Sequence, residues 1–253
     1  MRVAALYDIH GNLHALEAVL AEIEREAVDA VVLGGDFSAG PLAAETVDRL
    51  RGLGERAHFL RGNADRELAD PDWSLDDPAA VERLDFARAQ LGPERLEFLR
   101  SLPEHVVLDV EGLGSVLFCH GSPRTDMEIL TRATPEERLA AALDGVDADV
   151  VVCGHTHAQW RRDVDGRTVV NAGSVGMPYE GRPGAYWALL GPSVEHRRTE
   201  YDVETAAAAY RASGYPNAAE FARETLLEPA TAEEATAFFE QLALERPEFA
   251  GGP

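Results

Sequence analysis

Seven polar side chains of this sequence are of the types that bind divalent metal ions. Five short motifs contain them, each with a glycine beside it: Asp8, His10, Asp36, Asn63, His120, His155 and His157. Three of them offer carboxylate or amide oxygens and four offer imidazole nitrogens, a set that suits Mn, Fe, Zn or Ni. Because no thiolate belongs to the set, a structural zinc site is disfavoured. The residue types therefore predict a catalytic metal centre.

The number of these ligands indicates two ions. Seven ligands are too many for one tetrahedral ion, whereas two ions that share a bridging carboxylate account for them. Two ions about 3.5–4 Å apart can hold both the attacking and the leaving oxygen during displacement at phosphorus. A single His or Asp at the end of a strand is usually a cap or a solvated loop residue. All five motifs in order favour phosphoryl transfer instead.

The spacing within the motifs supports convergence on one point. Asp8 and His10 are two residues apart, as are His155 and His157. In extended backbone, such pairs project to the same side. The adjacent glycines would let the backbone turn sharply and approach an ion or a phosphate closely.

The elements that position these motifs are short apolar runs. Residues 3–7, 30–33 and 57–60 are predicted strands, and residues 13–23 have the apolar periodicity of a helix. Alternation of strand and helix implies a parallel sheet with helices outside. Ligand sites of open α/β sheets lie where strands end and loops begin, which is where the motifs fall.

The second half of the chain adds more strands. Residues 106–110 and 115–119 are separated by a glycine-containing turn and are predicted to form an antiparallel hairpin. Residues 150–153, 167–170 and 185–190 are also predicted strands.

Helical segments flank this strand-rich region. We expect one domain over residues 1–200, with a helical insertion near residues 76–101 that breaks at Gly92. Residues 201–253 are Ala-rich and acidic, contain none of the proposed ligands, and are predicted to form a C-terminal helical appendage.

Charge and composition exclude several functions. The net charge of −22, with arginine as the only strongly basic residue, disfavours sequence-independent binding of nucleic acid. An anionic substrate would need a local positive centre such as metal ions. We expect no signal peptide and no membrane helix, and Cys119 and Cys153 form no C-x-x-C pattern. A cytoplasmic protein with reduced, buried thiols is the resulting expectation.

Taken together, the order D-x-H, G-D, G-N, H-G and G-H-T-H resembles the calcineurin-like metallophosphoesterase superfamily over residues 3–190. The runs DIHGN from Asp8 and NAGSVG from Asn171 look like those of its small bacterial and archaeal phosphodiesterases. The resemblance implies an α/β fold, a four-layer α/β/β/α sandwich.

The resemblance also implies how the ligands divide. One ion would be bound by Asp8, His10, Asp36 and His157, and the other by Asp36, Asn63, His120 and His155. Asp36 would bridge the ions, and a hydroxide between them would be the nucleophile. We assign catalytic roles to Asp36, Asn63 and His120.

One position departs from the family. Its protein phosphatases and dinucleoside tetraphosphatases have a His after the G-N pair that is thought to protonate the leaving group, but here Ala64 stands there. General acid catalysis typically contributes about 10²–10⁴-fold, so its loss favours substrates with good leaving groups, such as activated phosphodiesters. Asp65 or His14 could donate the proton instead.

Three residues are predicted to bind substrate. Arg66 and Arg124 follow Asn63 and His120, and a guanidinium matches two phosphoryl oxygens, although surface arginines are an equal alternative. Asn12 could donate to a substrate oxygen or stabilise its turn.

Three functions remain open on the sequence. The first is a dinuclear-metal-dependent phosphodiesterase or phosphatase that acts on a small molecule or nucleotide. The second is a diadenosine tetraphosphatase or protein phosphatase, which Ala64 disfavours. The third is a non-enzymatic scaffold, which the complete ligand set disfavours. The partner would be a small phosphorylated substrate. The sequence does not indicate whether the protein is a monomer or an oligomer.

Overall fold

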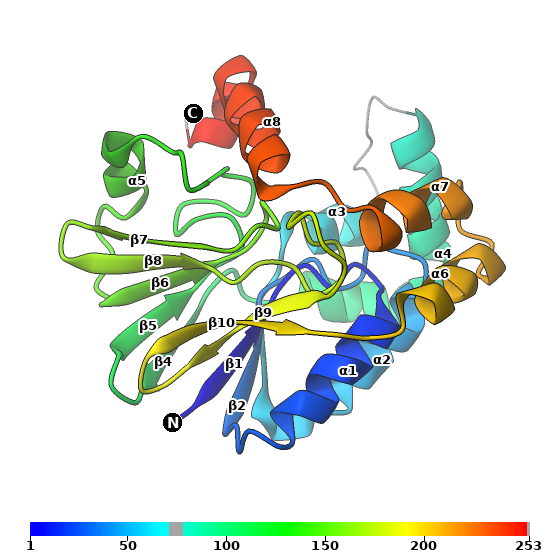
Figure 1. The fold of residues 1–253 in the computed structure, drawn as a ribbon, viewed down its shortest axis with the longest axis horizontal. Coiled ribbons are helices and arrows are strands. Elements are labelled where there is room, and N and C mark those ends of the chain that lie inside the picture. The colour runs from blue at the N-terminus through cyan, green and yellow to red at the C-terminus, as the bar shows by residue number, and fades with distance from the viewer. Residues whose placement is uncertain (71–77, 252–253) are drawn as a thin grey trace.

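Two five-stranded sheets form the centre of the computed structural model, which describes residues 1–70 and 78–251 (Figure 1). In spatial order, the first sheet contains β10 (Val194–Thr199), β9 (Ala185–Leu190), β1 (Val3–Leu6), β2 (Ala30–Leu33) and β3 (Ala57–Phe59). The second contains β4 (Val106–Val110), β5 (Gly114–Phe118), β6 (Val150–Cys153), β8 (Arg167–Asn171) and β7 (Trp160–Val164).

Each sheet contains three neighbouring strands that run parallel to one another. β1, β2 and β3 are parallel neighbours, and so are β5, β6 and β8. The predicted hairpin of β4 and β5 is confirmed as antiparallel, while β9 pairs antiparallel with β1. Because the carboxyl ends of parallel strands meet at one edge, the loops after these strands lie together.

Alternation along the strands assigns their side chains to layers. Val3 and Ala5 of β1 pack toward the second sheet, whereas Ala4 and Leu6 pack toward helices. Between the sheets, the buried Tyr7 hydroxyl donates a hydrogen bond to the Val152 carbonyl oxygen over 3.0 Å. The intersheet core thus fixes the two loop clusters relative to each other.

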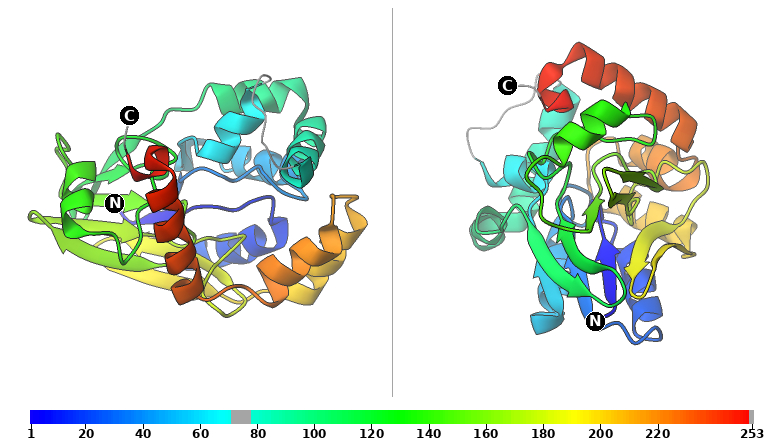
Figure 2. Two further views of the ribbon diagram at one scale, coloured as in Figure 1. Left: turned by 90° about the horizontal axis from the view of Figure 1, so that it is seen from above. Right: turned by 90° about the vertical axis from the view of Figure 1, so that its left-hand side faces the viewer.

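Helices cover the outer faces of both sheets and complete the predicted four-layer α/β/β/α sandwich (Figures 1 and 2). The helices are α1 (Leu13–Ile23), α2 (Ala43–Arg51), α3 (Asn63–Ala69), α4 (Pro78–Arg100), α5 (Glu136–Ala142), α6 (Val203–Ala212), α7 (Ala218–Ala222) and α8 (Ala232–Glu245). In the first sheet, α1 buries Leu16 and Leu20 in the same cluster as Leu6. Leu139 of α5 packs on Val151 of the second sheet.

The helical insertion and tail lie near the strand ends that carry the motifs (Figure 2). The insertion is α4, interrupted at Gly92 with φ 65° as predicted; the part of the expected range at residues 76 and 77 lies outside the described residues. Residues 201–253 contribute α6, α7 and α8, while their division from residues 1–200 as a separate domain stays a prediction. Among the described residues, no helix has the length and apolarity needed to span a membrane.

Two strands were not predicted from the sequence. β7 and β10 each form one of the two edges of their sheets and contain two arginines each, as edge strands commonly contain charged residues. Their polar character hides the apolar alternation that revealed the inner strands.

Candidate metal centre

The metal centre lies at the common carboxyl edge of the two sheets. Each motif follows its own strand, namely β1, β2, β3, β5 and β6, as predicted. Backbone hydrogen bonds join the loops: Asp8 N donates to Gly35 O over 3.1 Å and His10 N to Asp36 O over 2.9 Å. The chain therefore builds the site from loops that are fastened to one another.

Asp8, His10 and His157 form the first ligand group, and all three side chains are buried. Nε2 of His157 lies 3.2 Å from Asp8 Oδ1 and 3.2 Å from Nε2 of His10. Three donor atoms that converge in this way can bind one divalent ion.

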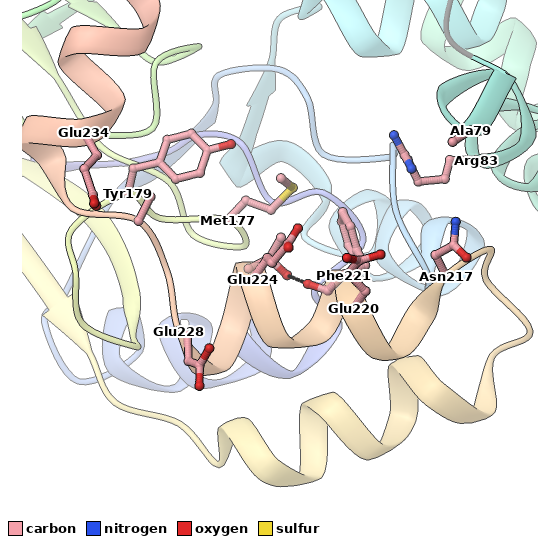
Figure 3. A pocket seen from close by; sticks show the side chains of 12 residues that line it. Ala79, Arg83, Met177, Tyr179, Asn217, Glu220, Phe221, Glu224, Glu228 and Glu234 are labelled. Atoms are coloured by element: carbon pink, nitrogen blue, oxygen red, sulfur yellow. Dashed lines mark hydrogen bonds between the residues drawn. The ribbon is translucent and has the colours of Figure 1, made fainter.

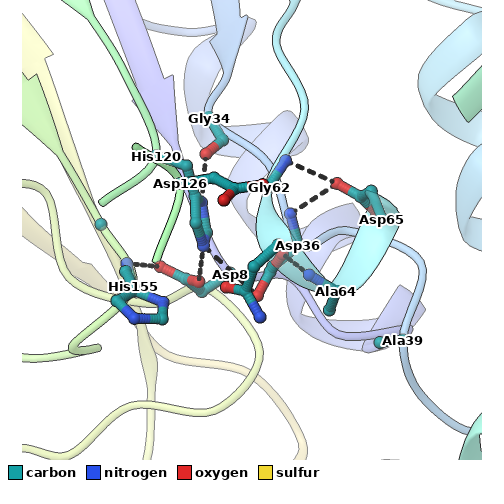
Figure 4. A network of polar contacts seen from close by, with 12 residues as sticks. Asp8, Gly34, Asp36, Ala39, Gly62, Ala64, Asp65, His120, Asp126 and His155 are labelled. Carbon is teal, nitrogen blue, oxygen red and sulfur yellow. Dashed lines mark hydrogen bonds and ion pairs between the residues drawn. The ribbon is translucent and has the colours of Figure 1, made fainter. Parts of the chain in front are cut away.

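Asp36, His120 and His155 form the second group (Figure 4). Nε2 of His120 is 3.3 Å from Asp36 Oδ2 and 3.8 Å from Asp8 Oδ1, and Asp36 Oδ2 is also 3.9 Å from His10 Nε2. Asp36 thus lies between the groups, where a bridging carboxylate has to be. Beside it, the Ala64 N–H donates to Asp36 Oδ1 over 2.8 Å, which places the start of α3 at the same centre.

Backbone carbonyls orient three of the histidines. Nδ1 of His10 lies 3.1 Å from Ala39 O, Nδ1 of His120 lies 2.8 Å from Gly34 O, and Nδ1 of His157 lies 2.8 Å from Met177 O. Because a carbonyl only accepts, each Nδ1 carries a proton, so Nε2 is the nitrogen that faces the centre and would bind an ion in its deprotonated state.

Several polar atoms at the centre are buried without a hydrogen-bond partner among the described residues. They are Asp8 Oδ1, Asn63 Oδ1 and His120 Nε2. Such atoms destabilise a fold unless something satisfies them, and all three are potential metal ligands. This donor set fits a pair of divalent ions.

The backbone conformation of the ligands differs from the prediction. Asp8, His10, Asp36, His155 and His157 have φ between 47° and 65°, in the left-handed region, so the expectation of extended pairs that project to one side is wrong. Left-handed non-glycine residues are strained and cluster at functional sites. The side chains converge because the loops curl after each strand.

Burial and neighbouring charges set the protonation of the group. Burial alone would raise the pKa of Asp8 and of Asp36, but the surrounding histidines lower both below their usual values. Burial alone would lower the pKa of His120, yet Asp36 and Asp8 raise it to about 10. For His155, burial and the charge of His120 lower the pKa to about 4. The carboxylates are therefore ionised, as metal ligands must be.

Two residues of α3 support the centre in roles that motif reasoning did not assign to them. Asp65 accepts hydrogen bonds from the backbone N–H of Asp36 over 2.7 Å and of Gly62 over 3.2 Å, so it positions the loops (Figure 4). Glu67 accepts a hydrogen bond from Asn63 Nδ2 over 3.3 Å, so the amide oxygen of Asn63 points away from Glu67. The signal for Glu67 was its spacing from Asn63 on α3, where residues four apart share a face.

The predicted substrate ligands have intramolecular partners. Nε and Nη2 of Arg66 lie 2.7 Å and 3.2 Å from the carboxylate oxygens of Asp126, and Arg124 binds the buried Glu128. Asn12 caps α1 by accepting from Ala15 N over 3.0 Å and also donates to Gly176 O. Substrate binding by these three residues stays a prediction.

Of the two candidate proton donors, neither lines the small cavity next to Ala64. His14 belongs to neither ligand group and lies near Asp202, at the start of α6. Cys119 and Cys153 are buried free thiols.

Several known proteins are similar to this chain in sequence and in fold. The calcineurin-like phosphoesterase superfamily domain matches residues 1–191. An uncharacterized protein of Methanocaldococcus jannaschii is 28% identical over 229 residues, which are 81% of this chain and 89% of that protein. A symmetrical bis(5'-nucleosyl)-tetraphosphatase of Nitrosococcus oceani is 31% identical over 186 residues, 68% of this chain and 64% of that one. The crystal structure of a metallophosphoesterase from Sphaerobacter thermophilus, 29% identical, superimposes with a TM-score of 0.71 and covers 89% of this chain and 99% of that one.

Proposed function

This chain belongs to the calcineurin-like phosphoesterase superfamily, and from that premise we propose that it hydrolyses phosphate esters of small molecules or nucleotides with the help of two divalent metal ions. The observation that carries the proposal is the meeting of two ligand groups around Asp36, with every side chain buried except the half-buried His155. Mn, Fe, Zn or Ni would suit their oxygen and imidazole donors.

The ligands would divide between the ions as the family pattern implies. Asp8, His10 and His157 would hold one ion, Asn63, His120 and His155 the other, and Asp36 both. When bound, the ion pair supplies hydroxide near neutral pH and neutralises charge on the phosphoryl oxygens.

The protein's own groups would orient this centre. The carbonyls that accept from Nδ1 of His10, His120 and His157 keep the rings from rotating, so the ligand atoms are in place before substrate arrives. Asp65 fixes the loops through the N–H groups of Asp36 and Gly62. Such preorganisation is the main protein contribution to phosphoryl transfer.

The residue at position 64 would not protonate the leaving group. Ala64 has no proton to donate from its side chain, and its backbone N–H is engaged by Asp36. Without a general acid there, esters of acidic alcohols should react faster than alkyl monoesters. Activated phosphodiesters are therefore the preferred substrates in this proposal.

Turnover of paired substrates tests the function. With Mn²⁺ present, we expect hydrolysis of bis-p-nitrophenyl phosphate, loss of activity in EDTA, and a rate for unactivated alkyl monoesters lower by about 10²-fold or more. Absence of hydrolysis after reconstitution with Mn²⁺ and with Ni²⁺ would refute the proposal. A clear preference for alkyl monoesters would refute the inference drawn from Ala64.

A second candidate is a dinucleoside tetraphosphatase, favoured by the similarity to the Nitrosococcus oceani protein. Ala64 argues against it. Release of ADP from diadenosine tetraphosphate at a rate above that for bis-p-nitrophenyl phosphate would favour this alternative. The scaffold alternative has less support, because the two ligand groups are complete.

A further inference from the structure

A cavity of about 710 Å³ opens beside the first ligand group (Figure 3). Met177 and Tyr179 form the wall nearest the metal centre. The carbonyl of Met177 accepts from Nδ1 of His157, and the Tyr179 ring stacks on the His157 ring with centroids 5.0 Å apart. The cavity therefore adjoins the first ligand group through Met177 and Tyr179, while none of the seven candidate ligands lines it.

The opposite wall comes from the helical insertion and the C-terminal tail. α4 contributes Arg83, and α7 together with the π-helical turn that follows it, η2 (Arg223–Leu227), contributes Glu220, Phe221 and Glu224. This tail lies beyond the family domain, which ends at residue 191. The cavity therefore uses residues that lie outside the matched superfamily domain.

The cavity combines aromatic surface with an excess of carboxylates. The rings of Tyr179 and Phe221 line it together with four glutamates and a single guanidinium, that of Arg83. Arg223 pairs with Glu224 over 2.7 Å and with Glu228 over 3.2 Å, whereas Glu220 has no ion-pair partner in the part of the chain that the structure describes. Such walls repel a second phosphate and attract an ammonium group, which also binds the faces of aromatic rings.

We propose that this cavity receives a cationic organic group, so that the substrate class is phosphodiesters of amino or quaternary ammonium alcohols. The proposal rests on the proposed function, because it assigns the organic group of a substrate whose phosphorus reacts at the metal centre. The retained ester group lies in the cavity while the leaving alcohol departs elsewhere.

Three chromogenic esters with the same leaving group test the class. They are p-nitrophenyl phosphorylcholine, its uncharged isostere p-nitrophenyl 3,3-dimethylbutyl phosphate, and bis-p-nitrophenyl phosphate. In the first, water adds a hydroxyl group to phosphorus and the P–O bond to the leaving group breaks, so that phosphocholine, p-nitrophenolate and one proton are released. We expect kcat/KM for the choline ester to exceed that for its isostere about tenfold.

Paired variants assign the preference to the cavity. The double variant Glu220→Gln, Glu224→Gln should bring the ratio of the two kcat/KM values close to one. The control, Glu204→Gln with Glu248→Gln, removes the same charge from exposed positions of the tail outside the cavity and should keep the wild-type ratio. An equal fall of the ratio in the control would overturn the proposal, because bulk charge would then explain the preference.

Calorimetric titration with choline provides a readout that is independent of activity. Choline should bind the wild-type protein and bind the Glu220, Glu224 double variant more weakly. Hydrolysis of bis-p-nitrophenyl phosphate without preference for the choline ester would overturn this inference while leaving the proposed function intact. If no ester is hydrolysed, the proposed function fails, and lack of choline binding would then overturn the cavity assignment separately.

Discussion

Each candidate metal ligand combines a side chain that the sequence reveals with a backbone conformation that the sequence does not reveal. The residue types and their adjacent glycines predicted the seven ligands and their grouping into motifs. Left-handed φ values at Asp8 and His155 could not be predicted from spacing, because they depend on hydrogen bonds between loops distant in sequence, such as His155 N to Asp8 Oδ2. Neighbouring loops thus determine how each ligand points.

The bridging role of Asp36 predicts unequal effects of two ligand substitutions. Asp36→Asn should lower the occupancy of both metal ions, because its carboxylate lies between the two groups. Asn63→Ala should weaken one ion and leave the other bound. Outer-shell changes alone lower metal affinity or activity about 10- to 100-fold, so Asp36→Asn should exceed that. Plasma mass spectrometry of both variants, with circular dichroism as the folding control, measures the difference; equal metal contents would contradict the bridge.

Protonation of His120 predicts a pH-dependent metal affinity. Its pKa is raised to about 10 by Asp36 and Asp8 against the opposing effect of burial, so near pH 8 the metal-free protein holds an imidazolium that must lose its proton to bind an ion. Apparent Mn²⁺ affinity should therefore rise with pH up to about 10. Calorimetry at pH 8 in buffers of different ionisation enthalpy should show release of at least about one proton per chain. No proton release would contradict this charge state.

Loops at the ends of the strands are packed backbone against backbone. Gly176 N donates to Asp8 O over 3.0 Å, and a Cβ on Gly176 would lie 1.8 Å from Ile9 O. The run from Asn171 also supports this loop through Ser174, whose hydroxyl donates to Asp8 O over 2.7 Å. The element that follows β8 therefore shapes the first ligand group without supplying a ligand.

This close packing predicts that a methyl group added at Gly176 will weaken metal binding. Gly176→Ala should displace the loop of Asp8 and His10 and lower Mn²⁺ affinity by about 10- to 100-fold. Gly52→Ala at the end of α2 is the control: its φ of −66° suits alanine, so metal binding should not change. Isothermal titration with Mn²⁺ compares them, and wild-type affinity in Gly176→Ala would show that the loop does not depend on this contact.

Over the whole molecule, the sequence predicted the two sheets better than it predicted the positions of the helices around them. The inner strands, the parallel pairing and the sandwich followed from apolar runs and from the family resemblance. The edge strands β7 and β10 escaped prediction because their residues are mixed in character. The placement of α4, α7 and α8 could not be predicted either, since it depends on contacts far apart in sequence, such as Phe239 of α8, 6.4 Å from His155 between ring centroids.

Anomalous diffraction from crystals grown with Mn²⁺ tests the central claim most directly. Two peaks at the carboxyl edge of the sheets, both within bonding distance of Asp36, are the predicted result. One ion should also contact Asp8, His10 and His157, and the other Asn63, His120 and His155. A single peak, or two peaks that do not share Asp36, would contradict the dinuclear centre.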